Sequence, residues 1–409
     1  KGAGVLDYVA AWYYTAAKYI KETTIKTGFV STNSISQGEQ TGILWNELLN
    51  NYNIKIHFAH QTFSWSNEAK GKAAVHCVII GFSNFDIKDK YLYEYDDIKG
   101  EPHVKKVKNI NPYLAEANDL VILKRRQPIC NVSKISFGSM PNDGGNFLFS
   151  DEEKKEFLLL EPNSVNFVKP LLGGYEFLNG KKKWCLWLKD IQPNELRNLK
   201  EVQRRVENVK NLRLKSSRTA TQKLAAYPTL FGELRQPKNK FILIPLTSSE
   251  NRKYIPIGFF NSDYILNNTC SAIDNATLYE FGVLQSVIHK TWINYTCGRL
   301  ESRIRYSNEV VYNNYPWPFE PSDKNKQKVE GKAQKVLDAR ATFPESSLAD
   351  LYDPLTMPPK LVKAHQELDK AVDLCYRSQS FKDENTRIEY LFDLYNQYTA
   401  PLLSKKITK

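Results

Sequence analysis

The sequence predicts a protein of several domains, in which an α/β region is followed by an α+β region and then by a small all-α region. Three observations predict this order. Helical and strand periodicities alternate over residues 1–84, short strands mix with helices over about 119–320, and helical periodicity alone continues over 322–402. A chain of 409 residues, 42% of them hydrophobic, can bury the cores of two or three domains.

The first region alternates helices and strands. Helical periodicity over Val5–Lys21 is followed by a strand that begins at Gly28. Two apolar runs of strand length, 54–59 and 73–82, are separated by a polar loop at 60–72. We therefore expect an antiparallel pair of strands at the end of an α/β sheet.

The second region follows a charged, irregular stretch at 85–118 that we interpret as a linker. From about 119 to 320 the sequence mixes short apolar strands with helices. Its most regular helix is predicted over 193–213, where Leu and Val residues form an apolar stripe and Arg and Lys residues lie off it. The basic face is either a solvated surface or a surface that follows phosphates.

The third region has helical periodicity throughout. We interpret the polar segment 324–332 as a connector. Two helices are predicted after it, and Pro358 and Pro359 stand where the first of these would begin. Their apolar stripes contain Leu361, His365, Leu368, Val372, Cys375, Ile388, Leu391, Phe392 and Tyr395.

Composition narrows the classes of partner. A net charge of +12 favours a polyanion, and rings beside basic side chains suit base stacking as well as ordinary cores. The six cysteines are far apart with no CxxC pair, which argues against a zinc site or a disulfide scaffold and for a reducing cytosol. No run approaches ~20 apolar residues and the start has no signal-peptide pattern, so we expect no membrane partner.

The histidines do not suggest a metal site. His57 and His60 are three apart on a predicted strand, which points them to opposite faces, and no third ligand is nearby. His76 falls within an apolar run, where a hydrogen-bonded core histidine is the expected role. The sequence also has no Ser-His-Asp or Cys-His pattern, so we expect neither a metal nor a nucleophile.

The segment 297–307, CGRLESRIRYS, is the richest candidate for contacts to nucleic-acid bases. Glutamate accepts a hydrogen bond from cytosine N4, and arginine donates two to guanine O6 and N7. In an extended segment Glu301 and Arg303 share one face, so together they would read both bases of a C·G pair. The alternative is a surface ion pair worth little. Further candidates for phosphate or base contacts are Arg235, Arg252, Lys253, Arg299 and Arg305.

Three stretches resemble the MmeI-like family of bacterial restriction–modification enzymes, which are adenine-N6 DNA methyltransferases. They are VLDYVAAWYYTAAKYI with GFVSTNSISQGEQTGILW, then IHFAHQTFSWSNEAKGKAAVHCVIIGF, and then YPTLFGELRQP through CGRLESRIRYSNEVVYNNYPWPF. The resemblance implies that 1–84 end a class I methyltransferase fold, that 119–320 form an α+β target-recognition domain, and that 322–402 form a small all-α C-terminal domain. It also implies double-stranded DNA as the partner and a bacterial cytoplasmic location.

Two motifs that this resemblance leads us to expect are absent from the sequence. One is the Gly-rich loop that holds S-adenosylmethionine, and the other is the Asn-Pro-Pro-aromatic motif that holds the adenine amino group. The nearest match, Asn111-Pro112-Tyr113, lacks the second proline and falls in the predicted linker. Because the chain also begins without Met, we expect a C-terminal half. S-adenosylmethionine would then bind only in the full-length parent, and this chain, without the missing N-terminal half, would be inactive and bind no cofactor.

The resemblance further implies a role for an aromatic residue just ahead of the predicted strand pair. Adenine must leave the duplex before its N6 can be methylated, and flat side chains stack on the flipped base. Here that residue is Phe63 or Trp65, unless these rings only cover the core. In the family the charged pair after Gly-Arg-Leu resembles a specificity switch, and the form Glu301 with Arg303 implies a cytosine just 3′ of the target adenine.

Two other functions stay open. A non-enzymatic DNA-specificity subunit would use the same recognition segment, but half of a methyltransferase sheet would expose strand edges. An RNA-binding or RNA-modifying protein would share the basic charge and the aromatic content. Competition between a specific duplex and RNA separates these possibilities.

Overall fold

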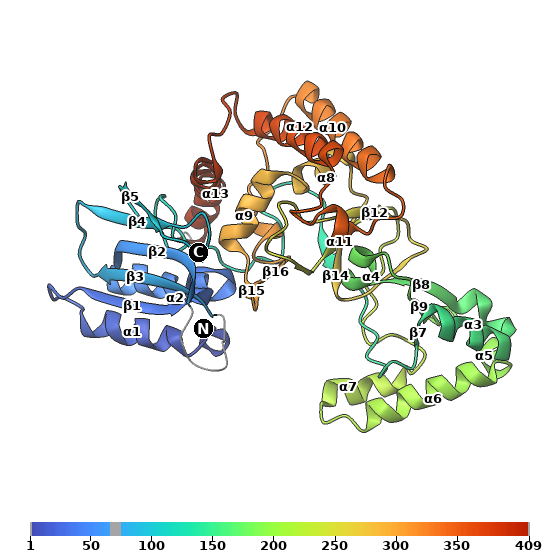
Figure 1. Ribbon diagram of the computed structural model, residues 1–409. Coiled ribbons are helices and arrows are strands. Elements are labelled where there is room, and N and C mark those ends of the chain that lie inside the picture. Colours follow the sequence, from blue (N-terminus) through green and yellow to red (C-terminus); the bar gives the residue numbers. More distant parts are fainter. Residues whose placement is uncertain (1, 66–74, 408–409) are drawn as a thin grey trace.

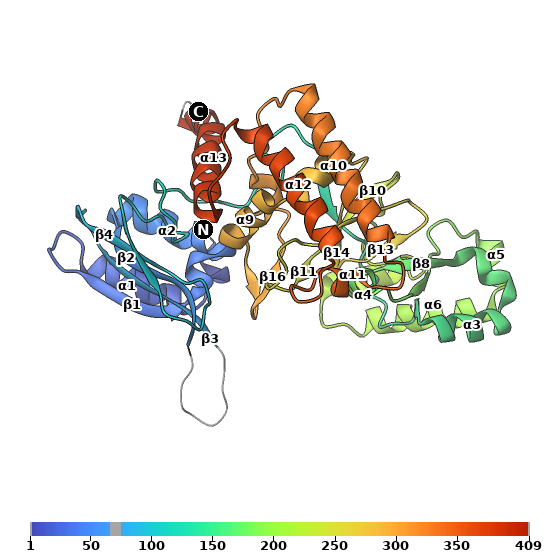
Figure 2. The same cartoon turned by 45° about the horizontal axis from the view of Figure 1, so that its top comes forward.

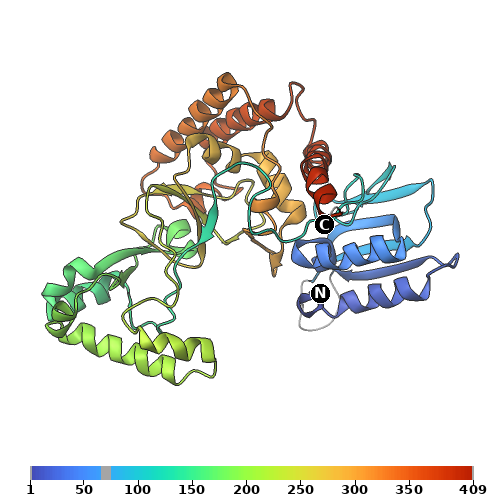
Figure 3. The same cartoon turned by 180° about the vertical axis from the view of Figure 1, so that it is seen from behind.

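The computed structural model describes residues 2–65 and 75–407 and has the outline of an arch (Figure 1). An N-terminal α/β part forms one end, and a lobe that contains α6 forms the other. A central part with several small sheets joins them, and long C-terminal helices cover its outer side. The reverse view shows the same arrangement (Figure 3).

The N-terminal part is a five-stranded sheet of order β1-β3-β2-β4-β5. Its elements are α1 (Val9–Tyr19), β1 (Thr27–Thr32), η2 (Asn33–Ser36), α2 (Gly38–Tyr52), β2 (Lys55–Trp65), β3 (Val75–Ser83), β4 (Lys90–Glu94) and β5 (His103–Val107). Strand β3 is antiparallel to both of its neighbours, so β1 and β2 run parallel to each other and the predicted antiparallel pair is confirmed. Apolar side chains of α1 and α2, among them Tyr13 and Trp45, pack on the sheet.

Two predictions about this part are wrong. The polar loop expected at 60–72 is strand up to Trp65, since the ladder with β3 continues past two irregularities; 66–72 lie outside the described residues. The segment 85–118, expected to be an irregular linker, contains β4 and β5, which pair with each other and extend the sheet beyond β2. Charged residues interrupt the apolar pattern of both strands and hid this pairing; β5, the edge strand, keeps most of its side chains in solvent.

The central part and the outlying lobe contain three small sheets of order β12-β10-β14-β6, β13-β8-β9-β7 and β11-β16-β15. The strands are β6 (Ile135–Phe137), β7 (Leu148–Phe149), β8 (Val168–Leu172), β9 (Trp184–Leu186), β10 (Phe241–Pro245), β11 (Thr247–Ser248), β12 (Gly258–Phe260), β13 (Ile265–Leu266), β14 (Cys270–Asp274), β15 (Arg299–Leu300) and β16 (Arg303–Arg305). The helices are α3 (Asp151–Leu160), α4 (Gly174–Asn179), α5 (Pro193–Arg197), α6 (Lys200–Leu214), α7 (Thr219–Lys223), α8 (Leu278–Leu284) and α9 (Val287–Thr296).

The helix predicted over 193–213 is split into α5 and α6. Val202, Val206 and Val209 are buried as the stripe predicts. Arg213, expected on the basic face, is instead fully buried in the lobe. Its guanidinium donates hydrogen bonds to five backbone carbonyl oxygens, those of Pro141, Asn142, Leu224, Tyr227 and Leu230.

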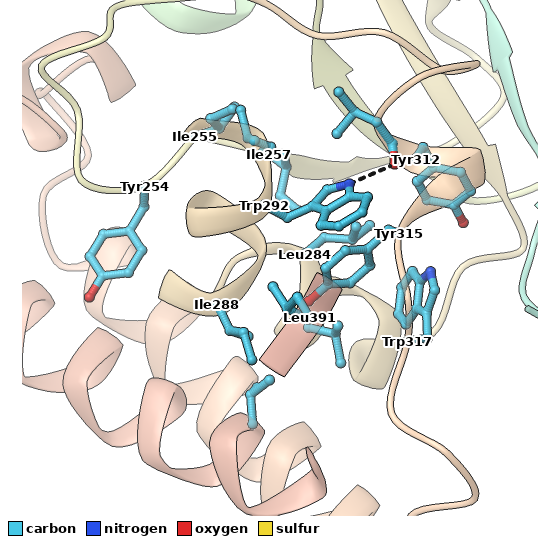
Figure 4. Packing of buried hydrophobic residues seen from close by; sticks show 14 of the residues in the cluster. Tyr254, Ile255, Ile257, Leu284, Ile288, Trp292, Tyr312, Tyr315, Trp317 and Leu391 are labelled. Atoms are coloured by element: carbon cyan, nitrogen blue, oxygen red, sulfur yellow. Dashed lines mark hydrogen bonds between the residues drawn. The ribbon is translucent and has the colours of Figure 1, made fainter. Parts of the chain in front are cut away.

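The C-terminal helices are α10 (Asp323–Ala341), α11 (Leu348–Leu351), α12 (Pro359–Tyr376) and α13 (Glu384–Ile407). Helix α12 begins at Pro359, and both predicted stripes are buried. The segment 324–332, expected to be a connector, lies within α10, and its one apolar side chain, Val329, packs on α8. These helices share one core with the central part, around Trp292, whose indole Nε1 donates to the carbonyl of Val311 (Figure 4).

Helix α13 also reaches the N-terminal sheet (Figure 2). Its Asn385 Nδ2 donates to the carboxylate of Glu94 on β4, and Phe392 packs against Tyr113. Within the described residues, no helix combines the length and apolarity that crossing a membrane requires.

Candidate nucleic-acid interface

The segment 299–305 forms a hairpin that projects toward the inner side of the arch (Figures 1 and 3). In its register Leu300 pairs with Arg303 across a two-residue turn, and β11 pairs with the other edge of β16. Ile304 is fully buried and anchors the hairpin, while its neighbours Arg303 and Arg305 are exposed. The alternation of a strand thus turns both guanidinium groups away from the core.

The tip of the hairpin carries an exposed ion pair. Arg303 Nη2 lies 2.8 Å from Glu301 Oε2, and the two side chains are 48% and 77% exposed. We expected the pair to share one face of an extended segment, but Glu301 occupies the turn with φ of 58°, in the left-handed region that favours glycine. The two groups meet because the turn brings the carboxylate back over β16.

Arg299, at the root of the hairpin, is engaged inside the protein. Its Nε donates to Gln37 Oε1 at 3.4 Å and its Nη2 to the carbonyl of Asn294 at 3.2 Å. Burial lowers the pKa of this guanidinium. The side chain therefore joins the hairpin to the N-terminal part, across 262 positions of sequence.

The other predicted basic residues lie at different places. Arg252 Nη1 donates to Ser248 Oγ at 3.3 Å, and Arg252 lines, with Arg303, a groove of about 560 Å³ between the hairpin and α4. Lys253 beside it is exposed. Arg235 is exposed but pairs with Glu233 at 2.6 Å, and it lines neither the groove toward α4 nor the cleft described next.

A larger cleft, of about 860 Å³, lies between the hairpin and the N-terminal part. One wall holds Asn33, Ser34 and Gln37, which follow β1, and the opposite wall holds Glu301 and Arg305. Glu301 and Arg305 thus face the segment that follows the carboxyl end of β1, and open α/β sheets place their ligands at this end of their strands. Arg303 instead lines the groove toward α4.

The two predicted aromatic residues lie at this same end of β2. Phe63 is half-buried, with its ring stacked on Tyr95 at 5.6 Å, whereas Trp65 is 48% exposed. Asn33 Nδ2 donates to Thr62 Oγ1 at 3.3 Å and so connects the segment after β1 to the residue before Phe63.

The histidines have structural partners. His57 contacts Ser83 and the carbonyl of Phe85, and His60 stacks on Tyr93 at 4.1 Å. His76, expected in the core, is only half-buried. Among the described residues there is no group of three side chains suited to hold a metal ion.

Asn111 and two glycines in the segment 137–146, Gly144 and Gly145, shape turns of the backbone. The Asn111 carboxamide oxygen accepts from the amides of Tyr113 and Ala115, which shapes a buried turn. Gly144 and Gly145 have φ of 62° and 84°, as their turn requires. Gln37 and Gly38 also line the cleft, which the sequence did not predict, because its only signal was a single glycine at the start of a helix.

Family models match almost the whole chain. The model of the MmeI DNA-methyltransferase domain matches residues 1–94, that of the MmeI target recognition domain 116–319, and that of the MmeI C-terminal domain 321–403. These matches follow the order of parts that the sequence resemblance implied.

Two similar proteins cover nearly all of the chain. DNA methyltransferase A of Bacillus subtilis (strain 168) is 41% identical over 400 residues, which are 98% of this chain and 44% of that protein. The solved structure of the Type IIL restriction-modification enzyme MmeI in complex with DNA is 48% identical and has a TM-score of 0.91, covering 98% of this chain and 53% of that one. The chain thus spans about half the length of each.

Proposed function

Because this chain belongs to the MmeI family of restriction–modification DNA methyltransferases, we propose that it selects a specific duplex site and contributes one wall of the pocket for the adenine that is methylated on N6. The target recognition domain, the excess of 12 positive charges and the exposed hairpin support the first role. A basic surface supplies the phosphate contacts that fix register, and base-edge contacts supply sequence.

We propose that the N-terminal part is the end of a class I methyltransferase fold. In support, β3 lies antiparallel between two parallel strands, which is how a doubly wound sheet closes with a reversed pair. The methyltransferase part then extends to about residue 107, because β4 and β5 belong to its sheet, and the domain limits predicted at 119–320 and 322–402 are kept.

The residues of this chain do not suit S-adenosylmethionine by themselves. A site for this methyl donor needs a Gly-rich loop after a strand. Here β1 is followed by the short helix η2, and β2 ends in the aromatic residues Phe63 and Trp65. We propose that the cofactor binds only in the complete protein, whose relatives are about twice as long, and that this chain alone neither binds it tightly nor transfers methyl groups.

The chain's own residues would act on the DNA. Unstacking a base costs a few kcal/mol, which an aromatic wall offsets. Trp65 is the better candidate for that wall, since this residue is 48% exposed while the ring of Phe63 is packed on Tyr95. Methyl transfer to an amine then depends on orientation and on electrostatic stabilisation more than on a nucleophilic side chain.

The exposed Glu301–Arg303 pair is the observation that carries the DNA-reading proposal. Arg303 would donate to guanine O6 and N7 and Glu301 would accept from cytosine N4 of the same pair, giving a cytosine 3′ of the target adenine. The ion pair would hold both side chains in place before the DNA arrives.

Selection from a random duplex library with this chain tests the proposal. We expect enrichment of one motif that contains adenine followed by cytosine, with RNA of the same length failing to compete. Equal binding of RNA and duplex, or binding without an enriched motif, contradicts it. A purely non-enzymatic specificity subunit has less support, because residues 1–94 match a methyltransferase model.

A further inference from the structure

The backbones of Gly38 and Gly298 touch across the cleft. A Cβ atom on Gly38 would lie 2.8 Å from Gly298 Cα, so close that the backbone would have to shift, and 3.2 Å from Gly298 N, which is a tight contact. Gly38 also has φ of 70°, where L side chains are strained. Only glycine therefore satisfies both the space and the backbone conformation at this position.

Further contacts hold the same two segments together. Gln37, which precedes Gly38, accepts from Arg299, which follows Gly298. Lys124 Nζ lies 2.7 Å from Glu39 Oε2 and 3.8 Å from Glu309 Oε2, so it bridges the start of α2 and the segment after the hairpin.

One turn further along α2 there is a second close approach. A Cβ on Gly42 would lie 2.3 Å from the carbonyl oxygen of Ile122. The first turns of α2 are thus seated on two separate stretches of the recognition part.

The contact lies between the two sites of the proposed function. On one side, Gly298 directly precedes β15 and is three residues from Glu301 at the hairpin tip. On the other side, η2 ends two residues before Gly38, and its Asn33 is bonded to Thr62, next to Phe63. A displacement of Gly298 would therefore move the base-reading pair relative to the strand end that carries the aromatic wall.

We infer that the Gly38–Gly298 contact is a positioning contact, which fixes the distance from the base-reading hairpin to the end of β2 that carries the aromatic wall. Methyl transfer would then depend on correct recognition of the DNA sequence. The inference rests on the proposed function. It assigns Gly38 and Gln37 an effect on the chemical step and little effect on the affinity for DNA.

Gly38→Ala in the complete protein tests this, with Gly145→Ala and Gly180→Ala as matched controls. The control glycines have φ of 84° and 63°, and a Cβ on either meets nothing within 4 Å, so they share the backbone strain without the collision. We expect Gly38→Ala to lower kcat for methyl transfer by about 100-fold, as a misplacement near 1 Å does. KM for the specific duplex should change little, and the controls should retain kcat.

Two milder variants keep the test decisive if Gly38→Ala unfolds. In Gly298→Ala the new Cβ would lie 3.7 Å from Gly38 Cα, an ordinary contact, so its loss of kcat should be much smaller than that of Gly38→Ala. Gln37→Ala removes the bond to Arg299 without a collision and should lower kcat with KM retained.

Unchanged kcat in Gly38→Ala, or in Gln37→Ala where the first does not fold, overturns the positioning contact. So does a loss of DNA affinity that matches the loss of kcat. If the unmodified protein shows no preference for any duplex sequence, the proposed function itself fails, and that result is visible before any variant is made.

Discussion

The carboxylate of Asp369 on α12 accepts a hydrogen bond of 2.6 Å from the hydroxyl of Tyr254, which follows Arg252 and Lys253. Its other oxygen accepts from the amide of Val287 at 2.8 Å, at the start of α9. The same buried side chain therefore ties the C-terminal helices both to the loop with two candidate DNA contacts and to the helix that leads into the hairpin.

Asp369→Asn should flatten the dependence of stability on pH. Burial raises the pKa of Asp369 to about 6, above its ordinary value of 3.8. The folded state thus binds more protons between these values, so the stability due to Asp369 is present below pH 3.8 and is lost as pH rises through 6. An asparagine side chain cannot ionise, so the variant does not lose this stability as the pH rises. Between pH 4 and 7 its free energy of unfolding should therefore increase relative to that of the original protein, by roughly 2–3 kcal/mol at most, as thermal unfolding measures.

The control for this measurement is Asp263→Asn, at an exposed carboxylate in the turn before β13. Its stability should follow that of the original protein at every pH. If the stability of Asp369→Asn and that of the original protein depend on pH in the same way, the raised pKa of Asp369 is contradicted.

Glu301→Gly should abolish the preference for one base while leaving the stability of the protein unchanged or higher. Glu301 is held at φ of 58°, a conformation that costs roughly 1–2 kcal/mol for a residue with a Cβ and nothing for glycine. The exposed ion pair that Glu301 forms with Arg303 offsets only a small part of this conformational cost. We expect the variant to unfold at the same temperature as the original protein or above it, while losing the preference for cytosine next to the adenine. A clear drop in thermal stability would mean that the carboxylate serves the fold.

Trp65→Ala should impair base flipping with little loss of stability, because Trp65 is 48% exposed. Phe63→Ala should destabilise the sheet, since its ring is stacked on Tyr95. Fluorescence of 2-aminopurine at the target adenine, in the complete protein with its specific duplex, reports the flipped base. Normal fluorescence with Trp65→Ala would remove that residue from the pocket.

Much of the fold followed from periodicity. The antiparallel pair of β2 and β3 and the buried stripes of α12 and α13 were predictable, since apolar spacing indicates which face is buried, and the start of α12 was predictable from its prolines. The strands β4 and β5 were not, because charged residues interrupt the apolar pattern of both, although β4 lies inside the sheet and only β5 is at its edge. The burial of Arg213 was equally hidden, as its partners are backbone carbonyls from two other stretches, 141–142 and 224–230.

The candidate site was predictable in composition and less so in geometry. The segment 297–307 suggested that Glu301 and Arg303 act together, and the structure joins them, through a turn rather than along one strand. Arg299 was expected at the DNA, but its guanidinium is bonded to Gln37. The contact of Gly38 with Gly298 has no periodicity or motif that a sequence reveals, because it depends on how two domains meet.

The most direct test of the base-reading role is a double substitution, Glu301→Lys with Arg303→Asp. Lysine would donate to guanine where glutamate accepted from cytosine, and aspartate would accept from cytosine where arginine donated to guanine. Selection from a random duplex library should therefore return the original motif with guanine in place of the cytosine 3′ of the adenine, at similar overall affinity. The original motif with cytosine unchanged would contradict the account.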